Sequence, residues 1–299
     1  MIMLVVLVLI AGVAAMAIFR WVNTRLLTDP LYYDSDEAYK EGRVQGRLSM
    51  RESVAFLLRS KYLICIALIV VSYNLVINLT EVVWKHQVKE LYTSPHAYNL
   101  YMSQVTTVIG IVATLSALFI SGNAIRRCGW TFTAMLTPVI LLLTSIGFFG
   151  FLFFRESLEA FMLTALGTTP LALAVFFGSA QNIMSRGAKY SVFDATKEMS
   201  FVPLNTESQV KAKAVIDGVC SRLGKSGGSV IHQTLLLTLS SISASTPYVA
   251  GFLLVLIVLW ICAVSVLGKQ FKLLTTQPSS EGAVSVKEEP VMELARRVV

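Results

Sequence analysis

Charged residues are scarce in this sequence. Only 14% of the 299 residues are charged, whereas 55% are hydrophobic, and the mean hydropathy is +0.67. Soluble domains carry about a quarter of their residues as charged side chains, so this composition excludes an ordinary soluble domain. Stretches of about 20 residues with almost no charge recur along the chain, and each is long enough to cross a hydrocarbon core about 30 Å thick as a helix.

Histidine and cysteine are also few, and neither has the spacing of a metal or redox site. The chain has only three histidines, far apart, and no Ser/His/Asp group or pair of carboxylates indicates an enzyme. We therefore expect no metal, no cofactor and no catalytic residues. The four cysteines lie in or beside apolar stretches and are expected to be small packing residues without disulfides: Cys65, Cys128, Cys220 and Cys262.

The uncharged stretches predict an all-α, polytopic membrane protein. Backbone polar groups cannot stay unpaired in lipid, so spans of this composition must be helices. About seven spans are expected, at 2–19, 61–84, 100–122, 131–154, 158–182, 212–240 and 247–268.

These spans divide the chain into four parts. A helix at 1–20 precedes a cytoplasmic connecting loop at 21–60, which leads into a surface helix near Arg51. A six-helix bundle follows at 61–270, and a polar tail at 271–299 is expected to be disordered. Secondary transporters are commonly built from repeats of about six helices, so seven spans suggest one repeat preceded by the last helix of another. We therefore expect that the transporter has a second, N-terminal bundle that this sequence does not include.

Lys and Arg are unevenly distributed between the connections. They are frequent in 20–60 and 183–211, between the third and fourth spans, and at the start of the tail. This pattern places the C-terminus in the cytoplasm and accounts for the net charge of +7, so we predict contact with a lipid bilayer and no nucleic-acid binding. The alternative for 2–19 is a cleavable signal peptide; against it, Arg20 and Arg25 follow the apolar stretch and no positive residue precedes it.

Polar side chains repeat along one face of the second expected span. Their spacing of four, three and four residues aligns Asn74, Asn78, Glu81 and Lys85 on one side of a helix. An ionisable group at the centre of a span costs about 2.5–3.5 kcal/mol on insertion scales, so this stripe predicts a water-filled substrate path. The alternative is a local Glu81–Lys85 pair at the outer boundary, reaching into the headgroups.

A second polar stripe lies in the sixth expected span, at Asp217, Ser221, Lys225, Gly228 and His232. The glycines around Lys225 predict a close backbone approach or a local break, and a cation beside free N–H groups suits an anionic ligand such as a phosphate chain. The alternative is a structural ion pair of Lys225 with Asp217 or Glu81. A phosphate-binding loop that hydrolyses ATP is not expected, because Val219 stands where that motif needs glycine.

Three blocks of sequence resemble the bacterial and plastid-type ATP/ADP translocases, the nucleotide transporters of chlamydiae and rickettsiae. Residues 189–233 carry the most specific block, KYSVFDATKEMSFVPLNTESQVKAKAVIDGVCSRLGKSGGSVIHQ. Residues 72–92, SYNLVINLTEVVWKHQVKELY, and 129–144, GWTFTAMLTPVILLLT, match in the right order. The resemblance covers nearly the whole chain but only the second half of the family's roughly twelve-helix architecture.

The resemblance implies a major-facilitator-like transporter of a bacterial inner membrane that works by alternating access. Its substrates would be ATP and ADP, with nucleotide–proton symport or NAD transport as alternatives. The family's functional acidic residue falls on Glu81 and its functional lysine on Lys225. Tyr73 and Tyr101 are candidates for contact with adenine. A structural membrane subunit that binds no nucleotide remains a rival from another class.

Overall fold

The computed structural model describes residues 2–26 and 50–276 of the chain, and every element within those ranges is a helix. This confirms the all-α class. The chain separates into two compact units, Met1–Ser49 and Met50–Val299. In the first unit, α1 (Ile2–Trp21) covers the first expected span and continues into a short π-helix, η1 (Val22–Leu26).

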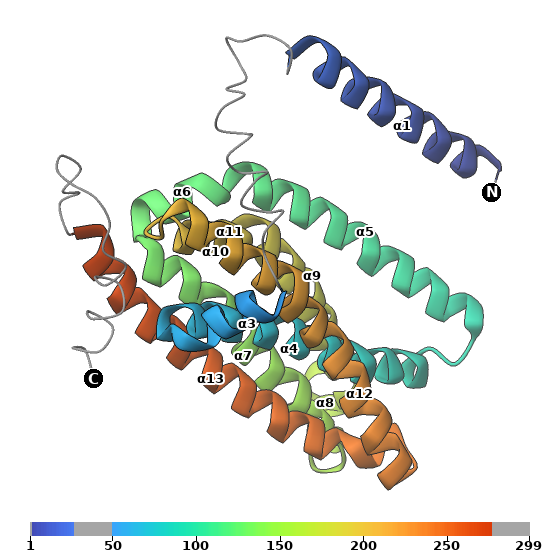
Figure 1. The fold of residues 1–299 in the computed structure, drawn as a ribbon. Helices are drawn as coiled ribbons and strands as arrows, with labels where there is room; N and C mark the ends of the chain where they lie inside the picture. Colours follow the sequence, from blue (N-terminus) through green and yellow to red (C-terminus); the bar gives the residue numbers. More distant parts are fainter. Residues whose placement is uncertain (1, 27–49, 277–299) are drawn as a thin grey trace, which may run out of the picture. The chain divides into compact units, whose positions relative to one another are not determined.

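The second unit is a helical bundle (Figure 1). In chain order its elements are α3 (Met50–Arg59), α4 (Lys61–Leu91), α5 (Pro95–Phe119), α6 (Ser121–Cys128), α7 (Trp130–Phe153), α8 (Arg155–Leu166), α9 (Pro170–Ala188), η2 (Lys189–Phe193), α10 (Asp194–Phe201), α11 (Thr206–Val215), η3 (Ile216–Cys220), α12 (Ser221–Leu239) and α13 (Ile242–Thr276).

Local sequence explains where several of these helices begin. The side chains of Ser60, Ser94 and Thr169 each accept a hydrogen bond from the backbone N–H three residues ahead, at the starts of α4, α5 and α9. Such caps satisfy donors that a helix leaves unpaired at its first turn. Pro95 and Pro170 then occupy the first helical position, where their missing N–H costs nothing.

Four helices in the described ranges are long and apolar enough to cross a membrane: α4, α5, α7 and α13. The bent pair formed by α8 and the α9–α10 segment would make a fifth. This count is lower than the seven expected from sequence. The sixth expected span does form a helix, α12, but Arg222, Lys225 and three glycines in its first half make it too polar to qualify by composition.

The expectation of an unbroken span at 158–182 was wrong. The chain turns by 89° between α8 and the segment that begins with α9. Gly167 ends α8 in the left-handed conformation at φ 64°, and the cap and proline of α9 follow within three residues. Glycine tolerates this conformation, and proline disfavours continuation of a preceding helix, so the sequence GTTP directs the break.

The predicted start of the C-terminal tail also differs. Helix α13 continues to Thr276, so residues 271–276 are helical and not a disordered tail; the rest of the expected tail, 277–299, lies outside the described residues. In the expected loop at 21–60, the surface helix predicted near Arg51 is present as α3. Residues 27–49 of that loop also lie outside the described part.

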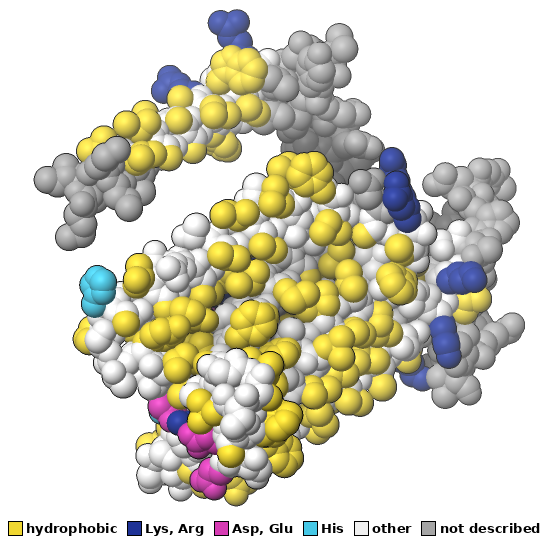
Figure 2. Space-filling view, turned by 180° about the vertical axis from the view of Figure 1, so that it is seen from behind, with side chains coloured by type: hydrophobic (Ala, Val, Ile, Leu, Met, Phe, Trp, Pro, Cys, Tyr) yellow, Lys and Arg dark blue, Asp and Glu magenta, His cyan; other side chains and the backbone are white. Residues whose placement is uncertain are grey.

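Helix α4 provides much of the core of the bundle. It packs against α9, α12 and α13, and buries Leu63, Val76, Leu79 and Val83 almost completely. By contrast, Val105 is the only side chain of α5 that is buried in the described unit. Figure 2 shows one face of the molecule, on which hydrophobic side chains extend between two charged ends of the bundle. Such a surface is expected where helices face lipid or other helices.

All four cysteines are free, as expected. Cys220 is buried and Cys65 is half-buried, which fits a packing role. Cys128 and Cys262 are exposed in this unit, so the expectation of packing within the bundle was wrong for these two. Cys128 ends the short helix α6, and Cys262 lies in an outward-facing position of α13.

Candidate functional site

Glu81 is the centre of a charged cluster on α4 and α9, which we call the Glu81 cluster. Its Oε1 lies 2.7 Å from Nζ of Lys85, and its Oε2 lies 3.3 Å from Nη2 of Arg186. The Glu81 side chain is 25% exposed, and both cations are more exposed than it is. The local Glu81–Lys85 pair considered from sequence is therefore present, but it is joined by a second cation from another helix.

Arg186 was not among the residues singled out from sequence. It was counted as a positive charge of the 183–211 connection, because the apolar pattern ends near residue 182. Helix α9 in fact continues to Ala188 and carries Arg186 in its last turn. The sequence carried one signal, the helix-spaced polar residues Gln181, Asn182 and Ser185. In the structure all three are buried, so α9 remains inside the bundle up to this point.

Hydrogen bonds between side chains fix α9 against its neighbours. Gln181 donates from Nε2 to Ser145 Oγ at 3.0 Å and to Thr80 Oγ1 at 3.3 Å, which links α9 to α7 and α4. Trp84 donates from Nε1 to Ser179 Oγ at 3.1 Å. Buried polar groups need such partners, so these bonds specify how α4 and α9 pack and thereby where Arg186 meets Glu81.

Helices α4 and α12 approach closely at two glycines. A β-carbon placed on Gly224 would lie 2.7 Å from Cβ of Asn74, and one on Gly228 would lie 2.5 Å from Oδ1 of Asn78. The predicted close backbone approach is thus present. The predicted alternative, a local break, is absent, because α12 is continuous from Ser221 to Leu239.

Asn74 and Asn78 consequently lie at a helix interface, both half-buried. Asn74 donates from Nδ2 to the backbone carbonyl of Val70 at 2.8 Å, within its own helix. Asn78 Oδ1 is buried and accepts no hydrogen bond from any described group. The interface therefore holds an unused acceptor one turn before Glu81 on α4.

Lys225 is exposed, although its neighbour Gly224 is buried against α4. Among the described residues, no group accepts a hydrogen bond from its ammonium or pairs with it. The structural pair of Lys225 with Asp217 or Glu81, considered from sequence, is not formed, since both carboxylates are bound to other cations. Lys225 thus presents a positive charge that the described bundle does not neutralise.

Asp217 belongs to a different group of charges. It lies in η3, and its Oδ1 accepts a hydrogen bond from Nζ of Lys197 at 2.8 Å. Lys197 also lies 3.2 Å from Glu198, which in turn lies 2.8 Å from Nζ of Lys213. Asp217 and Lys225, which were expected on one polar stripe, therefore have different surroundings. Asp217 is paired with Lys197 of α10, whereas Lys225 has no partner among the described residues.

His232, the last member of the stripe, is buried and structural. Its Nε2 lies 3.0 Å from the backbone carbonyl of Leu79, an arrangement that joins α12 to α4. Tyr73 is buried as well and stacks on Phe193 with ring centroids 4.3 Å apart. This packing leaves no open ring face of Tyr73 on that side for a base. Tyr101 bonds to Ser179 and stacks on Tyr92 at 4.8 Å.

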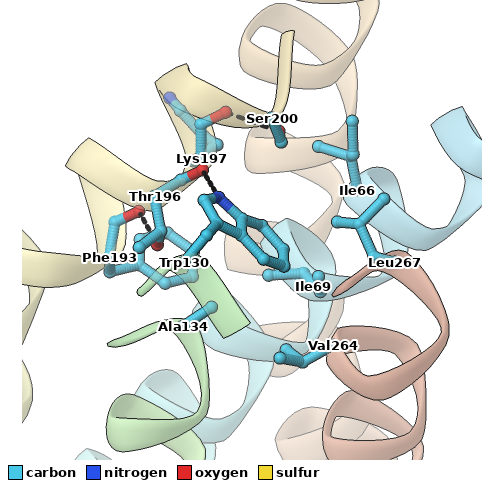
Figure 3. A pocket seen from close by; sticks show the side chains of 10 residues that line it. All are labelled: Ile66, Ile69, Trp130, Ala134, Phe193, Thr196, Lys197, Ser200, Val264 and Leu267. Atoms are coloured by element: carbon cyan, nitrogen blue, oxygen red, sulfur yellow. Dashed lines mark hydrogen bonds between the residues drawn. The ribbon is translucent and has the colours of Figure 1, made fainter. Parts of the chain in front are cut away.

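The pocket drawn in Figure 3 is apolar and lies among α4, α7, α10 and α13. The indole of Trp130 occupies its centre and donates from Nε1 to the carbonyl of Thr196 at 2.9 Å. Lys197 contributes to the wall, but its ammonium points away from the indole. This space is filled largely by its own lining and does not offer the charged surroundings that a nucleotide requires.

The Glu81 cluster and Lys225 thus supply cationic groups on α4, α9 and α12. In the described ranges, no group of three or more His, Cys, Asp or Glu side chains could hold a metal ion. Ammonium and guanidinium groups with too few carboxylate partners suit an anion, both in the Glu81 cluster and at Lys225.

Comparison with known proteins gives a consistent result. ADP,ATP carrier protein 1 of Chlamydia pneumoniae is 42% identical over 270 residues, which make up 90% of this chain and 52% of the relative. ADP,ATP carrier protein 1 of Rickettsia bellii is 38% identical over 273 residues, or 91% of this chain and 54% of the relative. This chain therefore spans about half the length of these curated relatives. No solved structure is significantly similar.

The family assignment rests on a match of nearly the whole chain. Residues 1–271 match the family model described as TLC ATP/ADP transporter. The match includes α4, α9 and α12, and with them Glu81, Arg186 and Lys225. The resemblance found in the sequence blocks is thereby confirmed: the chain belongs to the TLC ATP/ADP transporter family.

Proposed function

We propose that this chain takes part in exchange of ATP for ADP across a membrane by alternating access, and that it acts with a second, N-terminal helix bundle. The curated relatives from Chlamydia and Rickettsia carry the name ADP,ATP carrier protein. The proposal rests on Lys225 of α12, whose ammonium has no carboxylate partner among the described residues. The preceding residue, Gly224, is buried against α4, so Lys225 lies next to the contact between these two helices. The activity we propose for this site is transport without catalysis.

Lys225 holds the phosphate groups of the substrate in this mechanism. Its ammonium is exposed and has no carboxylate partner among the described residues, so it can donate charge-assisted hydrogen bonds to phosphate oxygens. Glu81 changes partners as the two bundles move, and Lys85 keeps the carboxylate of Glu81 partly neutralised. Exchange follows if the empty carrier reorients slowly compared with the loaded one.

The remaining proposed site residues position these groups. Asn74 and Asn78 lie against Gly224 and Gly228, so they set the distance between α4 and α12 and hence the place of Lys225. Asp217 ties the start of the α12 segment to Lys197 of α10. We further propose a bacterial inner membrane as the location, with the C-terminus and the Lys197–Asp217 end in the cytoplasm.

The decisive experiment is uptake of radiolabelled ATP into intact bacterial cells. The cells express this chain together with the N-terminal half of the Chlamydia pneumoniae relative, and cells with that half alone are the control. After loading, unlabelled ADP is added outside. Efflux of label on addition of ADP is the expected result and establishes counter-exchange.

Two other results would change the proposal. Uptake that collapses when a protonophore is added would indicate nucleotide–proton symport, and uptake of labelled NAD in preference to ATP would change the substrate. Absence of uptake for every nucleotide, with the protein present in the membrane, would favour the non-transporting structural subunit.

A further inference from the structure

We infer that Arg186 is a third charged residue of the transport site, and that its guanidinium exchanges the carboxylate of Glu81 for a substrate phosphate. This inference rests on the proposed function, because it names a contact of the same site. It concerns a residue that the sequence placed in a connecting loop, whereas the structure places it in α9 beside Glu81.

The hydrogen bonding of Arg186 is incomplete. A guanidinium has five N–H donors, arranged to grip a carboxylate or phosphate with two parallel bonds. Arg186 has one such bond to a described side chain, from Nη2 to Glu81, at a long 3.3 Å. Its Nε is buried and has no partner among the described groups. The Arg186 side chain is 42% exposed, so its remaining donors are accessible from outside the bundle, and Arg186 has capacity for a further anion.

The second charged network of the bundle shows the contrast. Lys197, Glu198, Lys213 and Asp217 comprise two cations and two anions, joined in a chain by contacts of 2.8, 3.2 and 2.8 Å. That network is internally neutral and suits a structural link. The Glu81 cluster has one carboxylate for two cations, so its formal charge is +1. It therefore attracts an anion, whereas the other network does not.

The geometry also allows the exchange of partners. Lys85 binds Oε1 of Glu81 and Arg186 binds Oε2, so the carboxylate keeps one cation when the guanidinium leaves. The Glu81 carboxylate then stays paired with Lys85, and opening the contact with Arg186 costs little because both side chains are partly exposed. A phosphate that binds Arg186 can thus displace Glu81 from the guanidinium while Glu81 remains paired with Lys85.

Close packing holds the part of α9 that precedes Arg186 in place. Trp84 lies so close to Gly178 that a β-carbon there would be 2.4 Å from the indole, and Gln181 is bonded to two other helices. Beyond Arg186 the helix passes into the π-helical turn η2. Single π-turns within helices are frequent at functional sites.

The inference is tested by the affinity of transport for its substrate. The full chain carries Arg186→Gln, Arg186→Lys or Glu81→Gln, and is expressed with the N-terminal half of the relative as above. Arg155→Gln is the matched control, because Arg155 is as exposed as Arg186 and also pairs with a glutamate, Glu90, but lies elsewhere in the unit. The measurements are KM and maximal rate of ATP uptake, and competition by ADP, AMP and adenosine.

We expect Arg186→Gln to raise KM for ATP by about tenfold or more, equivalent to about 1.4 kcal/mol of lost binding. Arg186→Lys retains the charge but not the two-bond geometry and should lie between it and the wild type. Glu81→Gln should lower KM, because the guanidinium no longer has a competing carboxylate, while the maximal rate falls. Competition by adenosine should not change in any variant, and Arg155→Gln should resemble the wild type.

A purely structural Arg186–Glu81 pair predicts a different pattern. Arg186→Gln and Glu81→Gln would then lower the maximal rate or protein level equally, with KM unchanged, and the double variant would be no worse; this pattern overturns the inference. If the wild type takes up no nucleotide, the proposed function fails by itself. The inference is then decided by equilibrium binding of ATP to the purified chain in lipid nanodiscs, and equal affinity of wild type and Arg186→Gln would refute it.

Discussion

Asn78 lies directly against Gly228, with its Oδ1 2.5 Å from the point that a β-carbon of residue 228 would occupy. The same relationship holds one turn earlier between Asn74 and Gly224. Two polar residues and two glycines thus make a complementary surface between α4 and α12. Small residues four apart commonly allow helices in membranes to approach closely, and here they determine where Lys225 emerges.

Replacing Gly228 with alanine should separate α4 from α12. The added methyl group overlaps the amide of Asn78, and overpacking of this kind costs about 1–3 kcal/mol. We expect a lower midpoint of thermal unfolding in detergent and reduced uptake. The control is Gly251→Ala in α13, where a β-carbon meets no atom within 4 Å. Asn78→Ser should partly restore the Gly228→Ala protein, and failure of this rescue would locate the strain elsewhere.

The fold class followed from sequence because the membrane leaves few alternatives. Uncharged stretches of about 20 residues must be helical in lipid, so the positions of α4, α5, α7 and α13 were found with modest errors at their ends. The break at Gly167 was missed because the apolar pattern continues across it. The signals were the glycine and the Thr169-Pro170 cap, which hydropathy does not weigh.

The candidate site was found only in part, since spacing along one helix says nothing about the neighbouring helix. The stripe on α4 correctly grouped Glu81 with Lys85, but the partner on α9 could not be deduced from it. Asp217 and Lys225 share a stripe in sequence, yet the π-turn η3 and the pairing of Asp217 with Lys197 give them different surroundings. Long-range pairing of charges depends on how helices cross, which local pattern does not encode.

Lys225→Ala should weaken nucleotide uptake without unfolding the protein. The ammonium of Lys225 has no partner among the described residues, so its removal leaves no carboxylate unpaired and lowers the free energy of unfolding little. If it binds phosphate, loss of a charge-assisted hydrogen bond of about 1.5–3 kcal/mol raises KM roughly tenfold to a hundredfold. Arg222→Ala is the control, because Arg222 is an exposed cation on the same helix. Uptake by Lys225→Ala at the wild-type KM would show that Lys225 does not bind the substrate phosphates.

Cys128 offers a test of orientation. It is exposed at the end of α6, directly after Arg126 and Arg127, at an end expected to face the cytoplasm. A membrane-impermeant maleimide should label it in permeabilised cells but not in intact ones, and Cys128→Ser should remove that label. Thr93→Cys, placed in the exposed turn between α4 and α5, should be labelled in intact and in permeabilised cells alike. Labelling of Cys128 in intact cells would invert the topology.

Asp217→Asn should have a smaller effect than its place in the polar stripe suggests. Asp217 is 44% exposed, and ion pairs in such positions contribute about 0–1 kcal/mol, so we expect a slightly lower unfolding midpoint and little change in KM. The more buried Lys197, 14% exposed, joins both Asp217 and Glu198.

Lys197→Met removes two pairs at once and leaves two carboxylates close together on α10 and η3. It should therefore lower the midpoint further than Asp217→Asn does. High salt should narrow this difference, because it screens the repulsion between exposed charges. A tenfold rise in KM for Asp217→Asn at an unchanged unfolding midpoint would instead show that Asp217 acts on the substrate, and that the pair with Lys197 opens during transport.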